Sequence, residues 1–122
     1  MIKISEFDIA AFIKLTDNDI ELARELVALY FEDSPRNLRA IHEAIEKGDS
    51  ESLERAAHSI KGALGYFSHS RSVAAALRLE TIACNRDLSG ARVALAELES
   101  SLACLEPSLT AFISEHALAT CS

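Results

Sequence analysis

Residues 91–112 read ARVALAELESSLACLEPSLTAF, the clearest helical pattern in the chain. Large apolar residues recur there at steps of three or four: Leu95, Leu98, Leu102, Leu105, Leu109 and Phe112. This spacing places them on one side of an α-helix, as a seam of the kind that packs between helices in a bundle. The stretch therefore predicts a long amphipathic helix that belongs to a helical bundle.

Pro107 interrupts this pattern at a position off the apolar seam. Inside a regular helix, proline removes one backbone hydrogen bond and costs about 3 kcal/mol. We therefore expect a kink or an early stop at Pro107, and we expect residues 114–122 to fray at the end of the chain.

Helical signals also fill the chain before this stretch. Residues 6–15 predict a short first helix after Ser5 as its N-cap, and Thr16 and Asp17 open a second helix. Ser34 and Pro35 predict either a break or a kink in that helix. The second helix is expected to end at Gly48. Two more helices are expected, one over residues 50–67, capped by Asp49 and Ser50, and one over residues 70–85.

The chain lacks the alternating apolar and polar pattern of strands, and the connections between its predicted helices are short. Short connections favour antiparallel neighbours. The predicted fold class is therefore all-α, an antiparallel up-and-down four-helix bundle with a short additional N-terminal helix. We expect one domain over residues 1–122, with its core at about 9–113.

Composition excludes several functional classes. The 122 residues include 12 Lys and Arg against 19 Asp and Glu, a formal charge of −7, which argues against a nucleic-acid partner. The three cysteines, Cys84, Cys104 and Cys121, are far apart and form no C-x-x-C pair, as is typical of reduced thiols. No apolar run approaches the roughly 18 residues of a membrane span, and the first residues do not resemble a signal peptide. We therefore expect no membrane insertion and a cytoplasmic protein.

The segment RAAHSIKGALG, residues 55–65, carries the candidate chemistry. At about 100° per residue, the apolar side chains of this helix cluster near the direction of Leu53, and His58 points roughly 140° away from it. His58 is therefore expected to face water. The same half of the helix carries Lys61, Gly62 and Gly65, together with Glu51, Glu54 and Arg55.

Two glycines inside a helix need a reason, since each costs about 0.5–1 kcal/mol relative to alanine. Without side chains at Gly62 and Gly65, another molecule could come close to the imidazole of His58. Lys61 lies one turn from His58 and supplies a cation for an anion attached to the ring. Arg55, together with Arg71 and Arg78 of the next helix, predicts a site less acidic than the whole chain.

An exposed neutral imidazole is a nitrogen nucleophile at cellular pH. Beside a cation and open space, it suits reversible phosphoryl transfer, which depends mainly on positioning and charge neutralisation. The chain has no P-loop and no kinase-type glycine loop, so a partner must deliver the phosphoryl group.

The run Ala57-His58-Ser59-Ile60-Lys61-Gly62, followed by Leu79-Glu80 in the next predicted helix, resembles the histidine-containing phosphotransfer (HPt) domain of bacterial multistep phosphorelays. The resemblance covers residues 9–113. It implies a four-helix bundle whose histidine takes a phosphoryl group from the aspartyl phosphate of one receiver domain and passes it to another. Many family members have a glycine ten residues after that histidine, where this chain has Ser68.

Carried over to this chain, the resemblance makes His58 the phosphorylated residue, through Nε2, and Lys61 the residue that stabilises the phosphate. Gly62 would give the receiver room to approach, and Gly65 and Arg55 would belong to the same docking face. The implied partners are response-regulator receiver domains and a hybrid sensor histidine kinase. The chain would be a phosphocarrier without a kinase site and without a cofactor of its own, because Mg²⁺ would belong to the receiver.

Other interpretations of the sequence stay open beside this one. An inert helical adaptor could keep the bundle without the chemistry. A di-iron bundle is disfavoured because this chain lacks paired Glu-x-x-His motifs. A dimerising histidine kinase is disfavoured because this chain has Ser59, not an acid, directly after His58. We expect the apolar seam of residues 95–112 to be internal, so the chain is expected to be a monomer. His42, His69 and His116 are predicted to be surface or boundary residues, and contact of His69 with a docked partner is the less favoured alternative. Phe67 is assigned to the core.

Overall fold

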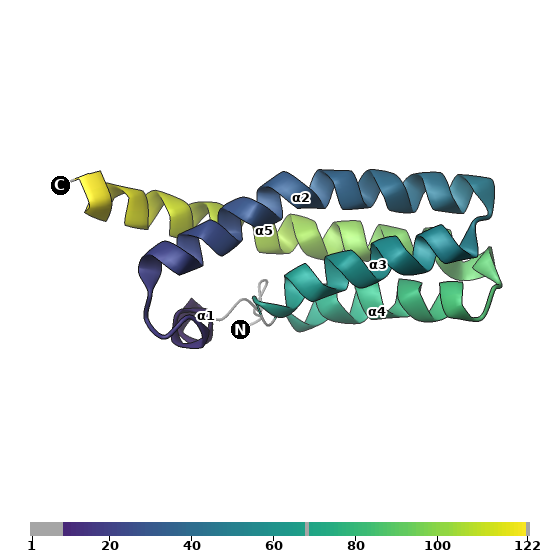
Figure 1. The fold of residues 1–122 in the computed structure, drawn as a ribbon, viewed down its shortest axis with the longest axis horizontal. Helices are drawn as coiled ribbons and strands as arrows, with labels where there is room; N and C mark the ends of the chain where they lie inside the picture. Colours follow the sequence, from purple (N-terminus) through teal and green to yellow (C-terminus); the bar gives the residue numbers. More distant parts are fainter. Residues whose placement is uncertain (1–8, 68, 122) are drawn as a thin grey trace.

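The computed structural model describes residues 9–67 and 69–121, with side chains up to residue 115. Over these residues the chain forms helices and no strand (Figure 1). The elements are α1 (Ile9–Leu15), α2 (Ile20–Lys47), α3 (Ser50–Gly65), α4 (Ser70–Cys84), the one-turn 3₁₀ helix η1 (Leu88–Gly90) and α5 (Ala91–Cys121). The all-α prediction is confirmed.

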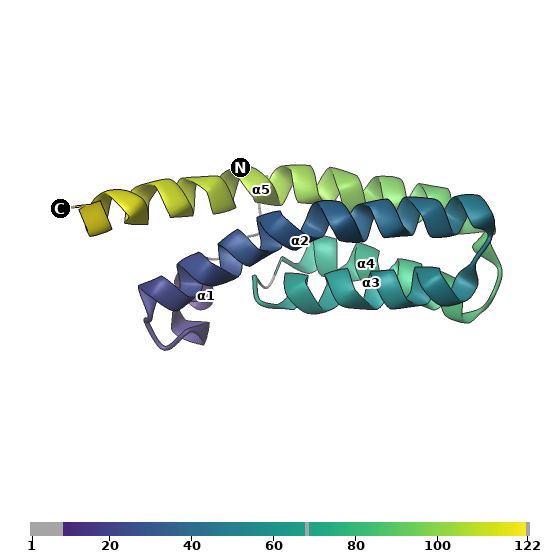
Figure 2. The ribbon, with the colours of Figure 1, turned by 45° about the horizontal axis from the view of Figure 1, so that its top comes forward.

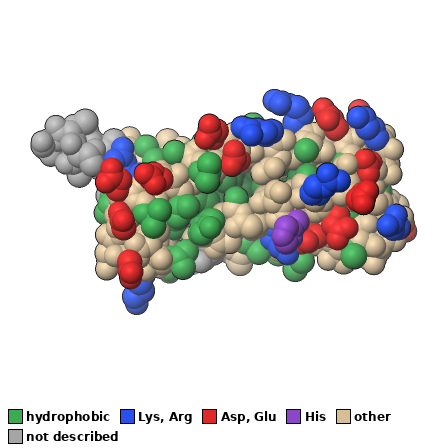
Figure 3. All heavy atoms as spheres, in the orientation of Figure 1, with side chains coloured by type: hydrophobic (Ala, Val, Ile, Leu, Met, Phe, Trp, Pro, Cys, Tyr) green, Lys and Arg blue, Asp and Glu red, His purple; other side chains and the backbone are tan. Residues whose placement is uncertain are grey.

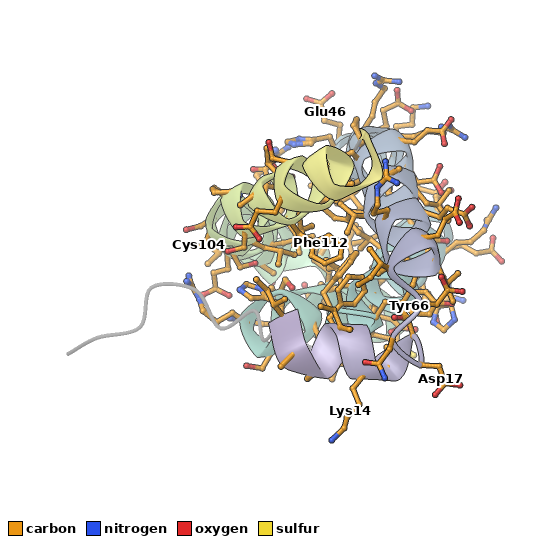
Figure 4. The ribbon with its side chains drawn as sticks, turned by 90° about the vertical axis from the view of Figure 1, so that its left-hand side faces the viewer. Lys14, Asp17, Glu46, Tyr66, Cys104 and Phe112 are labelled. Carbon is orange, nitrogen blue, oxygen red and sulfur yellow. The ribbon has the colours of Figure 1, made fainter. Side chains whose placement is uncertain are left out.

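The four long helices form a closed antiparallel bundle. α2 packs on α3, α3 on α4 and α4 on α5, and α5 returns to α2. Figures 1 and 2 show that α2 and α5 extend past the ends of α3 and α4 at one end of the bundle. The end-on view of Figure 4 shows α1 lying across that end. The predicted four-helix bundle with an additional N-terminal helix is therefore confirmed.

Capping residues fix the start and end of α2 and the start of α3. Asp49 accepts hydrogen bonds from the backbone N–H of Ser52 (3.1 Å) and from its hydroxyl (2.7 Å), and Gly48 ends α2 at a φ of 67°. The predicted caps at Gly48 and Asp49 are thus confirmed. The predicted start of α2 was wrong. Asp17 and Asn18 adopt positive φ in a turn, and Asp19 caps the helix instead, accepting from the backbone N–H of Leu22 (3.0 Å).

Both prolines lie inside continuous helices. The predicted break at Pro35 and the predicted early stop at Pro107 were wrong, because α2 continues to Lys47 and α5 to Cys121. Each proline is exposed, and so are the residues four positions earlier, Phe31 and Ala103, so water can hydrate the carbonyls left without a partner. Figures 1 and 2 show that the axis of α2 changes direction along its length, as a kink requires.

Some predictions fall partly outside the described residues. The predicted N-cap Ser5 and the start of the first helix at residue 6 lie among residues 1–8, and Ser68 is also outside the described residues. The fraying of residues 114–122 in solution stays a prediction. Cys84 and Cys104 are free thiols, as expected. None of the described helices combines the length and hydropathy that a bilayer-spanning segment needs.

The apolar seam of α5 forms the middle of the core. All six of its residues are at most 4% exposed, and Leu98, Leu105, Leu109 and Phe112 are fully buried. Phe12 of α1 closes the end of this core, because its ring packs against Phe67 (centroids 5.2 Å apart) and Phe112 (5.5 Å). Aromatic pairs of this kind contribute about 0.5–1.5 kcal/mol beyond the burial of their area. The core thus holds α1 across the bundle end.

A partly buried hydrogen bond also connects α2 to α5. The hydroxyl of Tyr30, a residue only 2% exposed, donates to Glu106 Oε2 at 2.8 Å. Burial, followed by the nearby Glu106 carboxylate, raises the pKa of Tyr30 far above its usual range. Tyr30 therefore stays a neutral donor at any physiological pH.

Replacing a seam residue should destabilise the bundle. Leu98→Ala leaves a cavity at a fully buried position, and we expect it to lower the free energy of unfolding by about 2–5 kcal/mol, measured by urea denaturation. Leu29→Ala is the matched control. Leu29 is 49% exposed, so its loss should change stability by about 0.5 kcal/mol. Equal effects of the two substitutions would contradict the assignment of the seam to the core.

Candidate functional site

His58 stands on the exposed side of α3, opposite the buried face of that helix. Its side chain is 69% exposed, whereas Leu53, Ile60 and Leu64 are fully buried. Figure 3 shows histidine at the surface of this face of the bundle, beside acidic and basic side chains. The predicted exposure of His58 is confirmed.

Glu80 of α4 holds both His58 and Lys61 with one carboxylate. Its Oε2 lies 2.9 Å from His58 Nδ1, and its Oε1 lies 2.7 Å from Lys61 Nζ. The Lys61 ammonium first, and the His58 ring after it, hold the pKa of the Glu80 carboxyl below its usual range, against the opposing effect of burial. Glu80 is therefore ionised at neutral pH.

The ionised carboxylate determines which ring nitrogen of His58 carries the proton. A carboxylate only accepts hydrogen bonds, so Nδ1 must be the donor in the 2.9 Å contact. In the neutral ring, the lone pair then lies on Nε2. The pair thus orients the imidazole and makes Nε2 the nucleophilic atom.

Glu80 was not among the residues that the sequence predicted for the site. Glu80 is 22 residues from His58 along the chain, and only the packing of α4 on α3 brings the two together. The one signal was the Leu79-Glu80 pair on which the family resemblance partly rested. Lys61 lies where it was expected, but its ammonium is already paired and its side chain is only 28% exposed.

Open space surrounds the two helix glycines. Gly62 and Gly65 are exposed, and a Cβ added at either position would meet no atom within 4 Å outside the neighbouring backbone of its own helix. Tyr66, half-exposed just after α3, borders this region, whereas Phe67 is buried as predicted. The described surface around Gly62 and Gly65 therefore leaves room for the close approach of another molecule.

The surroundings of His58 are more acidic than the sequence indicated. A shallow depression of about 420 Å³ beside the ring is lined by Glu51, Glu54, Arg55, His58 and Glu80. Arg55 is the one cation in that lining, against three carboxylates, and Lys61 adds a second cation at Glu80, so the site keeps a net negative charge.

Arg71 and Arg78 are turned away from this site. Arg78 Nη1 contacts Glu97 Oε1 at 2.6 Å, and Arg71 Nη1 lies 3.5 Å from Cys104 Sγ; both partners belong to α5. The two arginines precede Glu80 on α4 by nine and two residues, which places them roughly 180° and 200° around the helix from it. Their predicted contribution to the potential at His58 was therefore wrong.

The other histidines differ from one another. His42 is exposed as predicted, and its Nε2 lies 2.9 Å from Glu99 Oε2. The prediction for His69 was wrong, because this residue is fully buried before α4, with Nδ1 2.9 Å from Ser72 Oγ. The connection from α3 to α4 packs it inside the bundle, where it cannot touch a docked partner. The side chain of His116 lies outside the described residues.

Metal-ligating side chains do not gather anywhere in the described part of the chain: no group of three or more His, Cys, Asp or Glu residues could hold an ion. The site consists of an oriented imidazole, a shared carboxylate, a paired lysine and a side-chain-free surface beside them.

Comparison with known proteins gives a family and two similar folds. The sequence model described as the Hpt domain matches residues 25–107. Histidine-containing phosphotransfer protein B from Pseudomonas aeruginosa PAO1 has a similar fold, with a TM-score of 0.82 and 22% identity over 89% of this chain and 95% of that one.

The HPT domain of the Hpt sensor hybrid histidine kinase from Shewanella is also similar, with a TM-score of 0.79 and 15% identity over 93% of this chain and 97% of that one. At these identities the two structures show the fold alone. No protein with a curated description matches the sequence.

Removing the positive charge of Lys61 should raise the pKa of Glu80. In Lys61→Met we expect it to rise toward the ordinary value of about 4.3, measured by NMR titration of the side-chain carboxyl. Since the folded-state pKa is lowered, Glu80 stabilises the fold above its unfolded-state pKa, and this contribution is lost as the pH falls through the folded-state pKa. The substitution should therefore also weaken the loss of stability in acid.

Lys47→Met is the control for this titration, because it removes the same charge at the end of α2. It should leave the pKa of Glu80 unchanged. An unchanged pKa in Lys61→Met would show that the 2.7 Å ion pair does not exist in solution.

Proposed function

The chain belongs to the Hpt domain family, and we propose that His58 is the residue through which it accepts and passes on a phosphoryl group. Hpt domains are phosphocarrier modules that interact with receiver domains and hybrid kinases, and this chain is a phosphorelay intermediate. The observation that carries the assignment to His58 is the hydrogen bond from Nδ1 to Glu80, which leaves an exposed Nε2 free to react.

The proposed transfer balances without moving a proton. The Nε2 lone pair of His58 attacks the phosphorus of a receiver's aspartyl phosphate, an N–P bond forms, and the P–O bond breaks to release the aspartate carboxylate. The ring becomes positive as the N–P bond forms, because Nδ1 keeps its proton. The Glu80 carboxylate, 2.9 Å from Nδ1, stabilises that charge, and the reverse steps return the phosphoryl group to another receiver.

In the proposed transfer, Lys61 reduces the negative charge around His58. Three carboxylates lie beside His58, and each of them repels an incoming phosphoryl group. Lys61 offsets one of them directly through its contact with Glu80, and it lies one turn from His58 on α3. Lys61 therefore lowers the electrostatic cost of placing the phosphoryl group on the ring.

A partly apolar surface next to Gly62 and Gly65 supports the approach of a receiver. Gly62 and Gly65 leave α3 bare next to His58. Leu22 and Leu29, two turns apart on α2, and Tyr66 are 41–49% exposed. Figure 3 shows hydrophobic side chains gathered over the N-terminal half of α2 and toward α1. The proposed docking face therefore joins Gly62 and Gly65 to this apolar surface, with Arg55 on the other side of His58.

The proposal includes several further points. The chain acts as a monomer in the cytoplasm and does not bind nucleic acid, which is supported by the internal position of the α5 seam and by the charge of −7. It needs no ATP site and no cofactor of its own. A Mg²⁺ ion assisting the transfer would belong to the receiver, where it would neutralise charge on the transferring group.

The decisive test uses a radiolabelled phospho-receiver. The wild-type chain should take up label that is stable to base and labile to acid, and His58→Gln should take up none. His42→Gln is a matched control, because His42 is also exposed and also lies 2.9 Å from a glutamate, and it should be labelled like the wild type. Labelling of His58→Gln equal to the wild type would exclude His58, and a wild-type chain that no receiver labels would support the inert adaptor.

A side chain at position 62 should block docking without unfolding the bundle. Gly62→Leu places a bulky group in open space, and we expect it to slow transfer about a hundredfold while the melting temperature stays the same or rises. The control is Ala103→Leu, on the exposed side of α5, which should transfer normally. Full-rate transfer by Gly62→Leu would remove Gly62 from the docking face.

A further inference from the structure

A second candidate interaction surface lies in a groove between α4 and α5. The groove encloses about 570 Å³, the first half of α5 forms one wall, and α4 forms the other. Small residues make up its floor: Ala74, Ala75, Ala96, Ser100 and Ser101. A floor of small side chains leaves space for another helix to lie close to both backbones.

The rims of the groove carry cations and apolar side chains. Arg71 and Arg78 line it from α4, seven residues apart, which is about 10.5 Å along one helix face. From α5, Glu97 and Val93 line the groove, and Val93 is 60% exposed. The rims therefore carry two cations, one carboxylate and one exposed apolar side chain.

One of the two cations lacks an acidic partner. Arg78 is paired with Glu97, but none of the described acidic residues forms an ion pair with Arg71, whose Nη1 donates a hydrogen bond to Cys104 Sγ at 3.5 Å. Counting Glu97, the groove lining has two cations against one carboxylate, a net positive charge in a chain whose formal charge is −7. Its charge is therefore complementary to an acidic partner.

The groove is separate from the phosphoryl site. His58 and Lys61 meet α4 at Glu80, whereas Arg71 and Arg78 lie on the opposite side of α4 and contact α5. A partner in the groove would leave Nε2 of His58 accessible.

Charge also argues against a second copy of this chain as the occupant. In a two-fold dimer centred between Ala74 and Ala75, α4 would face its own copy in the antiparallel direction. Arg71 of one copy would then lie opposite Arg78 of the other, and like charges in close contact are unfavourable.

We propose that the α4–α5 groove binds an amphipathic helix of a partner protein that carries acidic residues seven positions apart. The two carboxylates would pair with Arg71 and Arg78, and small or apolar residues between them would contact the floor and Val93. The binding is independent of the phosphorylation of His58. It would let the chain be held by one protein while a receiver docks on the other face.

The test is an NMR titration of the full-length ¹⁵N-labelled chain. The probe is a stapled, alanine-rich helical peptide of about 18 residues, long enough for roughly five turns, with two glutamates seven positions apart and a leucine between them. Saturable shift changes should cluster on residues 71–78 and 93–101. A peptide with lysines in place of the glutamates should not bind. Shift changes centred on α3 around His58, or none that saturate, would overturn the proposal.

Charge reversal identifies the contacts. The double variant Arg71→Glu/Arg78→Glu should bind the probe about tenfold more weakly, and Arg71→Glu alone, which breaks no ion pair, should show about a threefold loss. Arg36→Glu/Arg39→Glu makes the same charge change at exposed positions of α2 and should bind normally. Equal affinity in the two double variants would overturn the proposal.

Labelling by a phospho-receiver distinguishes this proposal from the proposed function. Arg71→Glu should be labelled at the wild-type rate, because the groove and His58 are on different sides of α4. Lost labelling of this folded variant would show that the groove is part of the phosphoryl site and would overturn its separate role. Failure of the wild-type chain to be labelled would concern His58 alone.

Discussion

The packing of α3 on α4 through their buried faces determines the register that brings Glu80 of one helix beside His58 of the other. Ile60 and Leu64 of α3 and Leu79 of α4 are fully buried. A shift of one turn, about 5.4 Å, would separate the carboxylate from the imidazole and from Lys61 together. The rigid core thus positions the three polar side chains of the site, all of which lie on helices.

One carboxylate binds both the imidazole of His58 and the ammonium of Lys61, so the charge on either group affects the other. Glu80 fixes the tautomer of His58 through one oxygen and holds Lys61 through the other. Any change in the charge of Lys61 therefore reaches the imidazole through the carboxylate. The same bundle keeps Arg71 and Arg78 on the opposite side of α4, so the two faces of this helix have different electrostatic character.

The fold could be predicted largely from the sequence, because apolar spacing in an all-helical chain is a local signal. The caps at Gly48 and Asp49 and the seam of α5 needed only neighbouring residues. At each proline the sequence left a kink open beside a helix end, and the helix end was wrong, since packing on both sides of each proline outweighs a single lost hydrogen bond at an exposed position. Local propensity does not contain that tertiary contribution.

The site was predictable where it depends on one helix and hidden where it depends on two. The exposure of His58 and the open space at Gly62 follow from positions on α3 alone. Glu80, and the burial of His69 before α4, depend on how separate segments meet. Helical periodicity gives the face of each residue but not the neighbour that the face will meet.

The hydrogen bond to Glu80 has a consequence for the chemical identity of the phosphorylated form. A free imidazole offers two nitrogens to an electrophile and can give two regioisomers. In this chain the hydrogen bond to the carboxylate keeps the proton on Nδ1, so that only Nε2 has a lone pair available to react. Phosphorylation at His58 would therefore yield one regioisomer, and every receiver that docks would meet the same N–P bond in the same orientation.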